Sequence, residues 1–190
     1  SVLYEGKPVK TPDAGAFWRV IQDYAVKALF AAPTAFRAMR KEDPQSLCLR
    51  QYNLSSLQTV FMAGERLDPP TYHWMQELLG LPIIDHWWQT ETGWPICGNL
   101  MGLEPLPTKA GSATKPVPGF DVQIVDASGD EVGTDVEGLV AIKLPLPPSC
   151  LPTIWGSFER FRDTYLSEIP GFYVSGDSGY RDSDGYEFIM

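Results

Sequence analysis

Residues 85–95 read DHWWQTETGWP and combine three tryptophans with polar side chains. This stretch follows a short apolar run at 81–84, which we interpret as a strand. The polar side chains would then lie at the carboxyl end of that strand, the edge where open α/β sheets bind ligands. The adjacent indoles of Trp87 and Trp88 could form the wall of a pocket. A Trp-rich strand and turn that only fill a core would give the same pattern, so both interpretations stay open here.

Short apolar runs alternate with helical patterns in the first half of the chain. A helix is expected to start at Thr11, with Pro12 at its first position, because apolar residues then recur at helical spacing up to Tyr24. Further strands are expected at 28–31 and 57–62, and further helices at 35–41 and 69–79, the last capped by Asp68 and Gly80. This order predicts a parallel sheet with crossover helices, an α/β fold.

The pattern changes after residue 104. Residues 105–119 are rich in proline, which we interpret as a linker or surface loop. Beyond it, alternating or short apolar runs predict strands at 120–124, 138–144, 173–175 and 186–189, with a hairpin turn at 182–185 and one helix at 158–166. The expected domains are therefore an α/β part at 1–104 and a small antiparallel, barrel-like β subdomain at 105–190.

Composition excludes several classes of function. The net charge of −9 argues against a nucleic-acid partner, and no apolar run is long enough to span a membrane. Three well-separated cysteines suggest neither disulfides nor a zinc site, which is typical of a reducing compartment such as the cytoplasm. A mitochondrial matrix location would fit equally if the source is eukaryotic. Both ends resemble strands without caps, so a fragment of a longer enzyme is expected.

Single candidate residues have structural explanations as well as functional ones. Gly64 follows an expected strand and would let a flat ligand approach the backbone, although a strand-to-helix turn also explains it. Asp177 follows a glycine at an expected strand end and could accept hydrogen bonds from ribose hydroxyls, or form an Asx turn. Asp182 and Asp184 are expected in the hairpin turn. His86 has no neighbouring acid or thiol in the sequence that would indicate a nucleophilic relay.

Four motifs in collinear order resemble the AMP-forming short-chain acyl-CoA synthetases of the adenylate-forming superfamily. They are GE at 64–65, DHWWQTETG at 85–93, AGSATKP at 110–116 and GD at 176–177. The resemblance extends through essentially the whole chain. WQTETGWP at 88–95, GERLD at 64–68 and KLPLPP at 143–148 are similar to the propionyl-CoA branch more than to the acetate branch.

The resemblance implies a ligase that joins a propionate or acetate carboxylate to ATP and then transfers the acyl group to the thiol of coenzyme A. Small molecules are therefore the expected partners, with Mg²⁺ as the metal. Thr90 would bond the α-phosphate and Glu91 would hold Mg²⁺, which makes these two the expected catalytic residues. The residues expected to bind ATP or AMP are Gly64, Glu65, Arg66, Asp85, His86, Trp87, Trp88, Gln89, Thr90 and Asp177.

The same resemblance places Ala63, Trp88 and Gly93 at the acyl pocket. The indole of Trp88 would close the pocket end and limit the acid to a short chain. Ala63 stands where acetate-selective relatives usually carry valine, so it would leave room for about one more methylene, worth about 1–3 kcal/mol. Arg66 stands where acetate enzymes usually carry proline.

Other parts of the family's machinery are absent from these 190 residues. There is no Ser/Thr/Gly-rich phosphate loop, no Gly-Arg-x-Asp-Asp hinge and no downstream domain with a catalytic lysine. The missing halves of the parent chain are thus further expected partners, and the chain alone is not expected to form the adenylate. Two alternatives remain at this point: an adenylation domain for an amino or aryl acid, and a non-catalytic nucleotide- or partner-binding module on the same scaffold.

Overall fold

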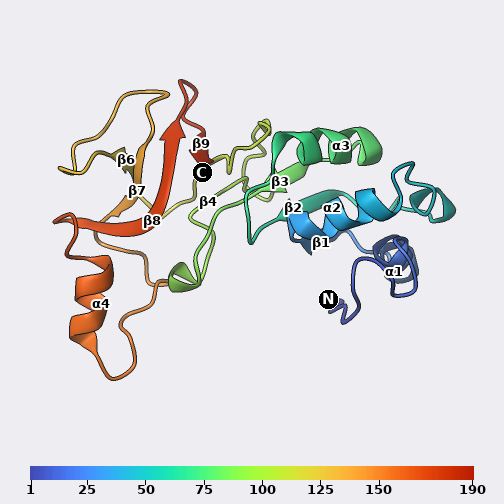
Figure 1. The fold of residues 1–190 in the computed structure, drawn as a ribbon, viewed down its shortest axis with the longest axis horizontal. Helices are drawn as coiled ribbons and strands as arrows, with labels where there is room; N and C mark the ends of the chain where they lie inside the picture. Colours follow the sequence, from blue (N-terminus) through green and yellow to red (C-terminus); the bar gives the residue numbers. More distant parts are fainter. The chain divides into compact units, whose positions relative to one another are not determined.

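The computed structural model describes residues 1–190, which form two compact units, Ser1–Ile84 and Asp85–Met190. Each unit contains its own sheet, and the elements are labelled in Figure 1. None of the helices combines the length and the apolar character needed to cross a bilayer. The domain division predicted between residues 104 and 105 stays a prediction.

The first unit contains a three-stranded sheet in the order β1 (Ala28–Ala31), β2 (Thr59–Met62), β3 (Ile83–Asp85). Strands β1 and β2 are parallel, with Leu29 opposite Val60. Helices α2 (Pro33–Glu42) and α3 (Pro69–Leu79) connect successive strands and contact each other (Figure 1). The predicted sheet with crossover helices is therefore confirmed.

Local chemistry sets the helix boundaries in this unit. Helix α3 begins after Asp68, whose Oδ1 accepts a hydrogen bond from the Thr71 N–H at 2.9 Å, and it ends at Gly80 with φ of 63°. Helix α1 spans Ala16–Tyr24, later than the start predicted at Thr11. That prediction is wrong because the Thr11 hydroxyl accepts from the Lys7 N–H and Asp13 forms a turn with the Gly15 N–H. A 3₁₀ turn, η1, follows at Leu49–Gln51.

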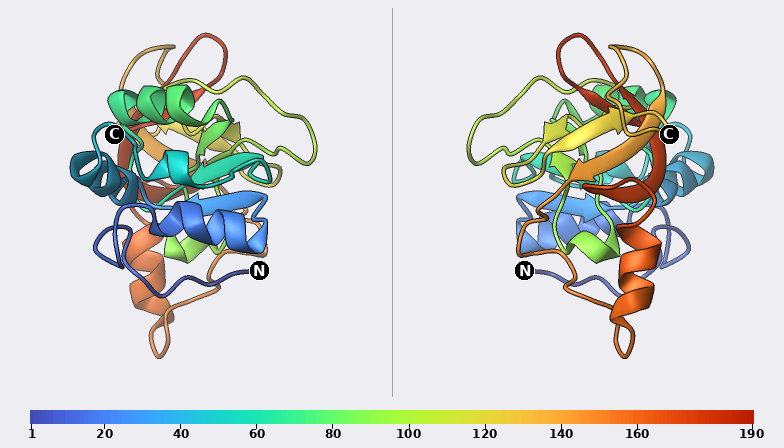
Figure 2. Two further views of the ribbon diagram at one scale, coloured as in Figure 1. Left: turned by 90° about the vertical axis from the view of Figure 1, so that its right-hand side faces the viewer. Right: turned by 90° about the vertical axis from the view of Figure 1, so that its left-hand side faces the viewer.

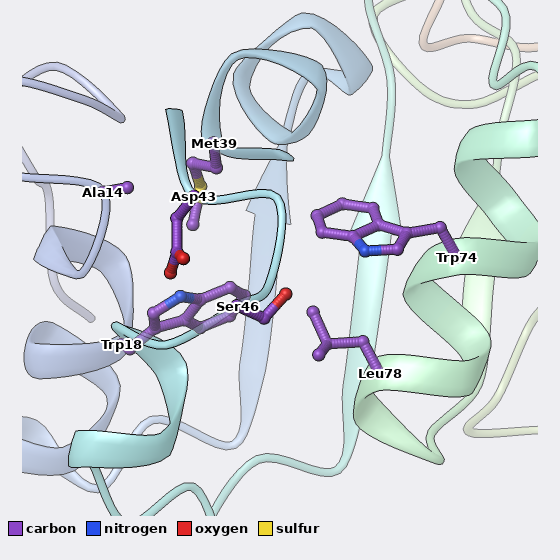
Figure 3. A pocket seen from close by; sticks show the side chains of 7 residues that line it. All are labelled: Ala14, Trp18, Met39, Asp43, Ser46, Trp74 and Leu78. Atoms are coloured by element: carbon purple, nitrogen blue, oxygen red, sulfur yellow. The ribbon is translucent and has the colours of Figure 1, made fainter. Parts of the chain in front are cut away.

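The side chains between α1, α3 and the loop after α2 enclose only a small hollow. Figure 3 shows Trp18, Asp43 and Ser46 on one side of it and Trp74 and Leu78 of α3 on the other. The Asp43 carboxylate accepts hydrogen bonds from the Leu47 and Cys48 N–H groups at 2.9 and 2.7 Å. The Asp43 carboxylate therefore stabilises the turn that follows α2.

The second unit contains an antiparallel sheet in the order β6 (Val122–Val125), β7 (Gly138–Lys143), β8 (Phe172–Arg181), β9 (Glu187–Ile189). Helix α4 (Phe158–Tyr165) precedes β8 and is capped by the Ser157 hydroxyl. A separate pair, β4 (Cys97–Gly98) with β5 (Lys115–Pro116), was not predicted. Its second strand lies in the stretch interpreted as a linker, where two residues are too short to show a periodic pattern.

Strand β8 contains a bulge that bends it. Leu139 of β7 pairs with Ser178 and Ala141 pairs with Val174, so three residues of β8 oppose one of β7. The middle residue, Gly176, has φ of 81°, a conformation that favours glycine. Figures 1 and 2 show the bend along β8. The strand is thus much longer than the predicted 173–175, and Asp177 lies within it rather than after its end.

The β8–β9 hairpin is held by charge at its turn. Asp182 Oδ1 accepts from the Asp184 and Tyr186 N–H groups at 3.0 and 2.9 Å. The Lys109 ammonium bonds the Asp182 and Asp184 carboxylates at 2.5 and 2.6 Å and lies 4.3 Å from the Tyr186 ring centre. Asp182 and Asp184 are hairpin residues, as the sequence predicted.

Glu187 of β9 is a fully buried acid (0% exposed). Its Oε1 accepts from Arg181 Nε at 2.7 Å, and its Oε2 has no hydrogen-bond partner. Burial raises the pKa of the Glu187 carboxyl, while Arg181 opposes that rise and the charges of Asp182 and Glu131 add to it. An acid in this environment binds its proton more tightly in the folded chain than in the unfolded chain.

We predict that Glu187→Gln changes how stability depends on pH. The raised pKa means that the stability contributed by protonated Glu187 is fully present below about pH 4.5 and is lost as pH rises through the folded pKa. The glutamine variant cannot ionise there, so its free energy of unfolding should rise relative to wild type over this window, as measured by urea titrations at several pH values. The exposed Glu104→Gln is the control. Equal pH profiles for wild type and Glu187→Gln would contradict the assignment.

Candidate functional site

Residues 85–95 run from the end of β3 into a partly exposed turn, which backbone hydrogen bonds to Ile96 and Cys97 hold. The Trp87 N–H donates to the Cys97 carbonyl at 3.0 Å, and the Ile96 N–H donates back to the Trp87 carbonyl at 2.8 Å. A 3₁₀ turn, η2 (Thr90–Thr92), follows, and the buried Thr92 hydroxyl lies 2.9 Å from the Trp94 carbonyl oxygen. Trp88 and Trp94 are 41% and 55% exposed. Two of the three indoles therefore do not fill a core.

The side-chain amide of Gln89 joins this stretch to the bulge of β8. Its Nε2 donates to the Ser175 carbonyl at 2.8 Å and to Asp177 Oδ2 at 3.1 Å, and its Oε1 accepts from the Tyr173 hydroxyl at 2.7 Å. Both N–H donors and the oxygen of the amide are therefore used, in one orientation. Gln89 is therefore held by residues more than eighty positions further along the chain.

Asp177 receives both of its donors on one oxygen. The Trp87 indole Nε1 donates to Oδ2 at 3.0 Å, beside the bond from Gln89, while no protein donor bonds Oδ1. The Asp177 N–H donates to the Ser175 hydroxyl oxygen, which fixes the bulge backbone. A half-buried carboxylate with one oxygen bound and one free suits the acceptance of hydrogen bonds from a hydroxylated ligand.

Glu91 lies in η2 and is held by Tyr165 from α4. The Tyr165 hydroxyl donates to Glu91 Oε1 at 3.0 Å, and the Glu91 carbonyl accepts from the Leu151 N–H at 2.7 Å. Oε2 of Glu91 accepts no hydrogen bond from the protein. Among His, Cys, Asp and Glu residues, no group of three or more is arranged to hold a metal ion. A metal ion held by Glu91 would therefore need further ligands, such as water or phosphate oxygens, as is common for Mg²⁺.

Tyr165 and Tyr173 stack on each other, and their hydroxyls bond Glu91 and Gln89. Their ring centres are 5.4 Å apart and the planes are within 8° of parallel. Burial, followed by the charge of Glu91, raises the pKa of Tyr173; burial and the hydrogen bond to Glu91 raise the pKa of Tyr165. Both phenols thus remain protonated donors at neutral pH. Neither tyrosine was among the site residues expected from sequence, because their partners are more than seventy residues away.

The predicted site residues at positions 63–66 belong to the first unit. Glu65 is bound there by the Thr34 N–H and by Arg37, each at 2.6 Å, and Arg37 also bonds Asp68 at 2.7 Å. Gly64 and Arg66 are exposed, and Ala63 is buried after β2. The structure thus brings Trp87, Gln89 and Asp177 into direct contact within the second unit, with Asp85, His86, Trp88 and Thr90 beside them in sequence.

Comparison with known proteins identifies the family to which this chain belongs. The family model of AMP-binding enzymes matches residues 1–147, and the chain belongs to that family. Its relatives include the human mitochondrial acyl-CoA synthetase short-chain family member 3, which is 45% identical over 191 residues, covering all of this chain and 28% of that protein. The propionate–CoA ligase of Escherichia coli strain K12 is 41% identical over 192 residues, again over the whole chain and 30% of that protein.

A solved structure supports the same assignment. The anthranilate CoA ligase AuaEII, in complex with anthranoyl-AMP, superposes with a TM-score of 0.80 and 26% identity over 99% of this chain and 33% of that one. The resemblance read from the four motifs is confirmed. The chain spans less than a third of the length of the two relatives above.

Gly93 caps the end of η2 and lies close to the backbone at Ser149. Its φ is 62°, and a Cβ placed there would lie 2.6 Å from the Ser149 carbonyl oxygen. We predict that Gly93→Ala lowers the free energy of unfolding by about 1–3 kcal/mol more than Gly156→Ala. Gly156 is the matched control because its φ of 74° is similar but its Cβ would meet nothing within 4 Å. Equal losses in urea titrations would show that the contact with Ser149 does not constrain the turn.

Proposed function

We propose that the protein containing this chain is an ATP-dependent, AMP-forming ligase that activates propionate or acetate and transfers the acyl group to coenzyme A. A carboxylate oxygen of the acid would attack the α-phosphorus of ATP, and pyrophosphate would leave. The coenzyme A thiolate would then attack the acyl carbon, and AMP would leave. The whole-chain identity to a propionate–CoA ligase supports this reaction, and the contact of Trp87 and Gln89 with Asp177 is the structural observation that carries it.

Asp177 would accept hydrogen bonds from the ribose hydroxyls through Oδ1. Its second oxygen is already bound by Trp87 and Gln89, so the carboxylate cannot rotate without losing both bonds. Such preorganisation lowers the entropy lost when the nucleotide binds. Asp85 and His86 would border the adenine with Trp87.

Thr90 and Glu91 would act at the phosphates. The Thr90 side chain is exposed, so its hydroxyl is available to donate to an α-phosphate oxygen. Glu91 is held through Oε1 by Tyr165, which leaves Oε2 for Mg²⁺. The metal, when bound, supplies positive charge that offsets the negative charge of the departing pyrophosphate. The reaction then needs positioning more than a protein nucleophile.

Trp88 and Gly93 would line the acyl pocket. The exposure of Trp88 fits a pocket wall better than a packed core. The similarity to an anthranilate ligase keeps an aryl acid as an alternative substrate, but the identity of 26% is well below the 41% and 45% of the short-chain relatives. One of these relatives is mitochondrial by name and another is bacterial, so the proposed location is the cytoplasm, or the mitochondrial matrix if the source is eukaryotic.

Nucleotide binding tests this proposal against a non-catalytic module. In the full-length protein, Asp177→Ala should weaken AMP binding by at least tenfold in calorimetry and remove propionate-dependent ATP–pyrophosphate exchange, because the ribose loses its acceptor. The exposed Asp121→Ala is the control. AMP binding without any acid-dependent exchange in the wild type would favour the binding module, and unchanged AMP affinity in Asp177→Ala would refute the site.

Chain-length selectivity tests the acyl pocket. We predict that Trp88→Gly in the full-length protein shifts kcat/KM from propionate toward butyrate and hexanoate, since removing the indole opens space for added methylenes worth about 1–3 kcal/mol each. Trp155→Gly is the matched control because the Trp155 side chain is 99% exposed. If the selectivity profile of Trp88→Gly matches that of the control, Trp88 does not close the pocket.

A further inference from the structure

The stacked tyrosines Tyr165 and Tyr173 each bond a residue of the proposed site through the hydroxyl. Tyr173 lies on β8 and is 1% exposed, and Tyr165 lies at the end of α4, where it also packs against the buried Phe161. Core packing explains the rings, since aromatic pairs at this distance stabilise a core. It does not explain why both hydroxyls are aimed at side chains of the motif 85–95.

The Tyr173 hydroxyl holds the oxygen side of the Gln89 amide, to which it donates at 2.7 Å. The NH₂ faces the Ser175 carbonyl and the Asp177 carboxylate, which can only accept, so a turned amide would place its oxygen against that carboxylate. Without the Tyr173 donor, the amide oxygen would be left unsatisfied in a partly buried place, and the side chain would be held only through its NH₂.

The Tyr165 hydroxyl holds the Glu91 carboxylate in a similar way. It bonds Oε1 at 3.0 Å, and the parallel ring of Tyr173 limits how far the Tyr165 side chain can move. The free oxygen of Glu91 then has a defined position beside η2. The same stack therefore constrains both the acid proposed for the ribose and the acid proposed for the metal.

We propose that Tyr173 and Tyr165 are positioning residues: Tyr173 orients the Gln89–Asp177 pair for the ribose, and Tyr165 orients Glu91 for the metal-bound phosphates. This inference rests on the proposed function. It assigns each hydroxyl a separate effect, because each bonds a different residue of the site.

Tyr173→Phe in the full-length protein tests the first role. The substitution removes one hydroxyl and keeps both rings, so the stack remains. The Kd for AMP should rise about 3–10-fold, the size of one net hydrogen bond. Tyr180→Phe is the matched control, because Tyr180 lies on the same strand, stacks on Phe188 at 4.7 Å and bonds nothing in the site. A change below twofold relative to Tyr180→Phe would overturn the role of Tyr173.

A double-mutant cycle separates positioning from general loosening. If Tyr173 acts through Gln89, Tyr173→Phe should have less than a twofold further effect on the Kd for AMP in a Gln89→Ala background. Full additivity would overturn the inference even if both single variants bind weakly. Failure of the proposed function gives a different result. If the proposed function is wrong, Asp177→Ala leaves the affinity for AMP unchanged. If only the inference is wrong, Asp177→Ala weakens AMP binding and Tyr173→Phe does not.

Tyr165→Phe tests the second role by a different measurement. The concentration of Mg²⁺ that gives half-maximal ATP–pyrophosphate exchange should rise at least threefold, while the Kd for AMP measured without Mg²⁺ stays within twofold of wild type. Tyr173→Phe should show the reverse pattern. An unchanged Mg²⁺ requirement in Tyr165→Phe, or the same pattern in both variants, would overturn the division of roles.

Discussion

The candidate site depends on the hydrogen bonds of the Gln89 side-chain amide. This amide bonds a tyrosine hydroxyl, a backbone carbonyl and a carboxylate, all from β8, and so joins the motif after β3 to the bulge of a distant strand. Because every hydrogen-bonding atom of the amide is used, losing one partner leaves another unsatisfied in a partly buried place. Such fully satisfied networks favour a single geometry.

The bulge in β8 makes that contact possible. A regular strand would place Ser175 and Asp177 in the ladder with β7, whereas the bulge releases Ser175, Gly176 and Asp177 from it. The Ser175 hydroxyl bonds the Val140 carbonyl at 2.6 Å and accepts from the Asp177 N–H, so the released residues are still fixed. Bulges of this kind redirect side chains and are frequent near active sites. Asp177 thereby points to Trp87 and Gln89.

Sequence patterns predicted the features that depend on neighbouring residues. The strand at 28–31, the helix from Pro69 to Leu79 with both caps, and the hairpin acids follow from local spacing and turn chemistry. The motif 85–95 and Asp177 were recognised as candidates, and the structure places Asp177 in contact with two residues of that motif. Their assignment to ligands remains a proposal.

Features that depend on distant partners could not be predicted. The strands of the β4–β5 pair are too short to show a periodic pattern. The late start of α1 depends on the hydrogen bond that the Lys7 N–H donates to the Thr11 hydroxyl. The bulge depends on the register with β7, which no spacing within 172–181 reveals. Tyr165 and Tyr173 read as ordinary core aromatics, since only folding brings their hydroxyls to Glu91 and Gln89. The Gly176–Asp177 pair directly after an expected strand is the one local signal that the sequence offers.

The central claim is that Asp177, fixed by Trp87 and Gln89, receives the ribose of an adenylate. The most direct test is a crystal structure of the full-length protein with a non-hydrolysable propionyl-adenylate analogue. We expect both ribose hydroxyls to lie about 2.5–3.0 Å from the Asp177 carboxylate, with the bonds from Trp87 and Gln89 to Oδ2 intact. A ribose bound away from Asp177, or a ligand that breaks the Gln89 contact in order to bind, would contradict this account.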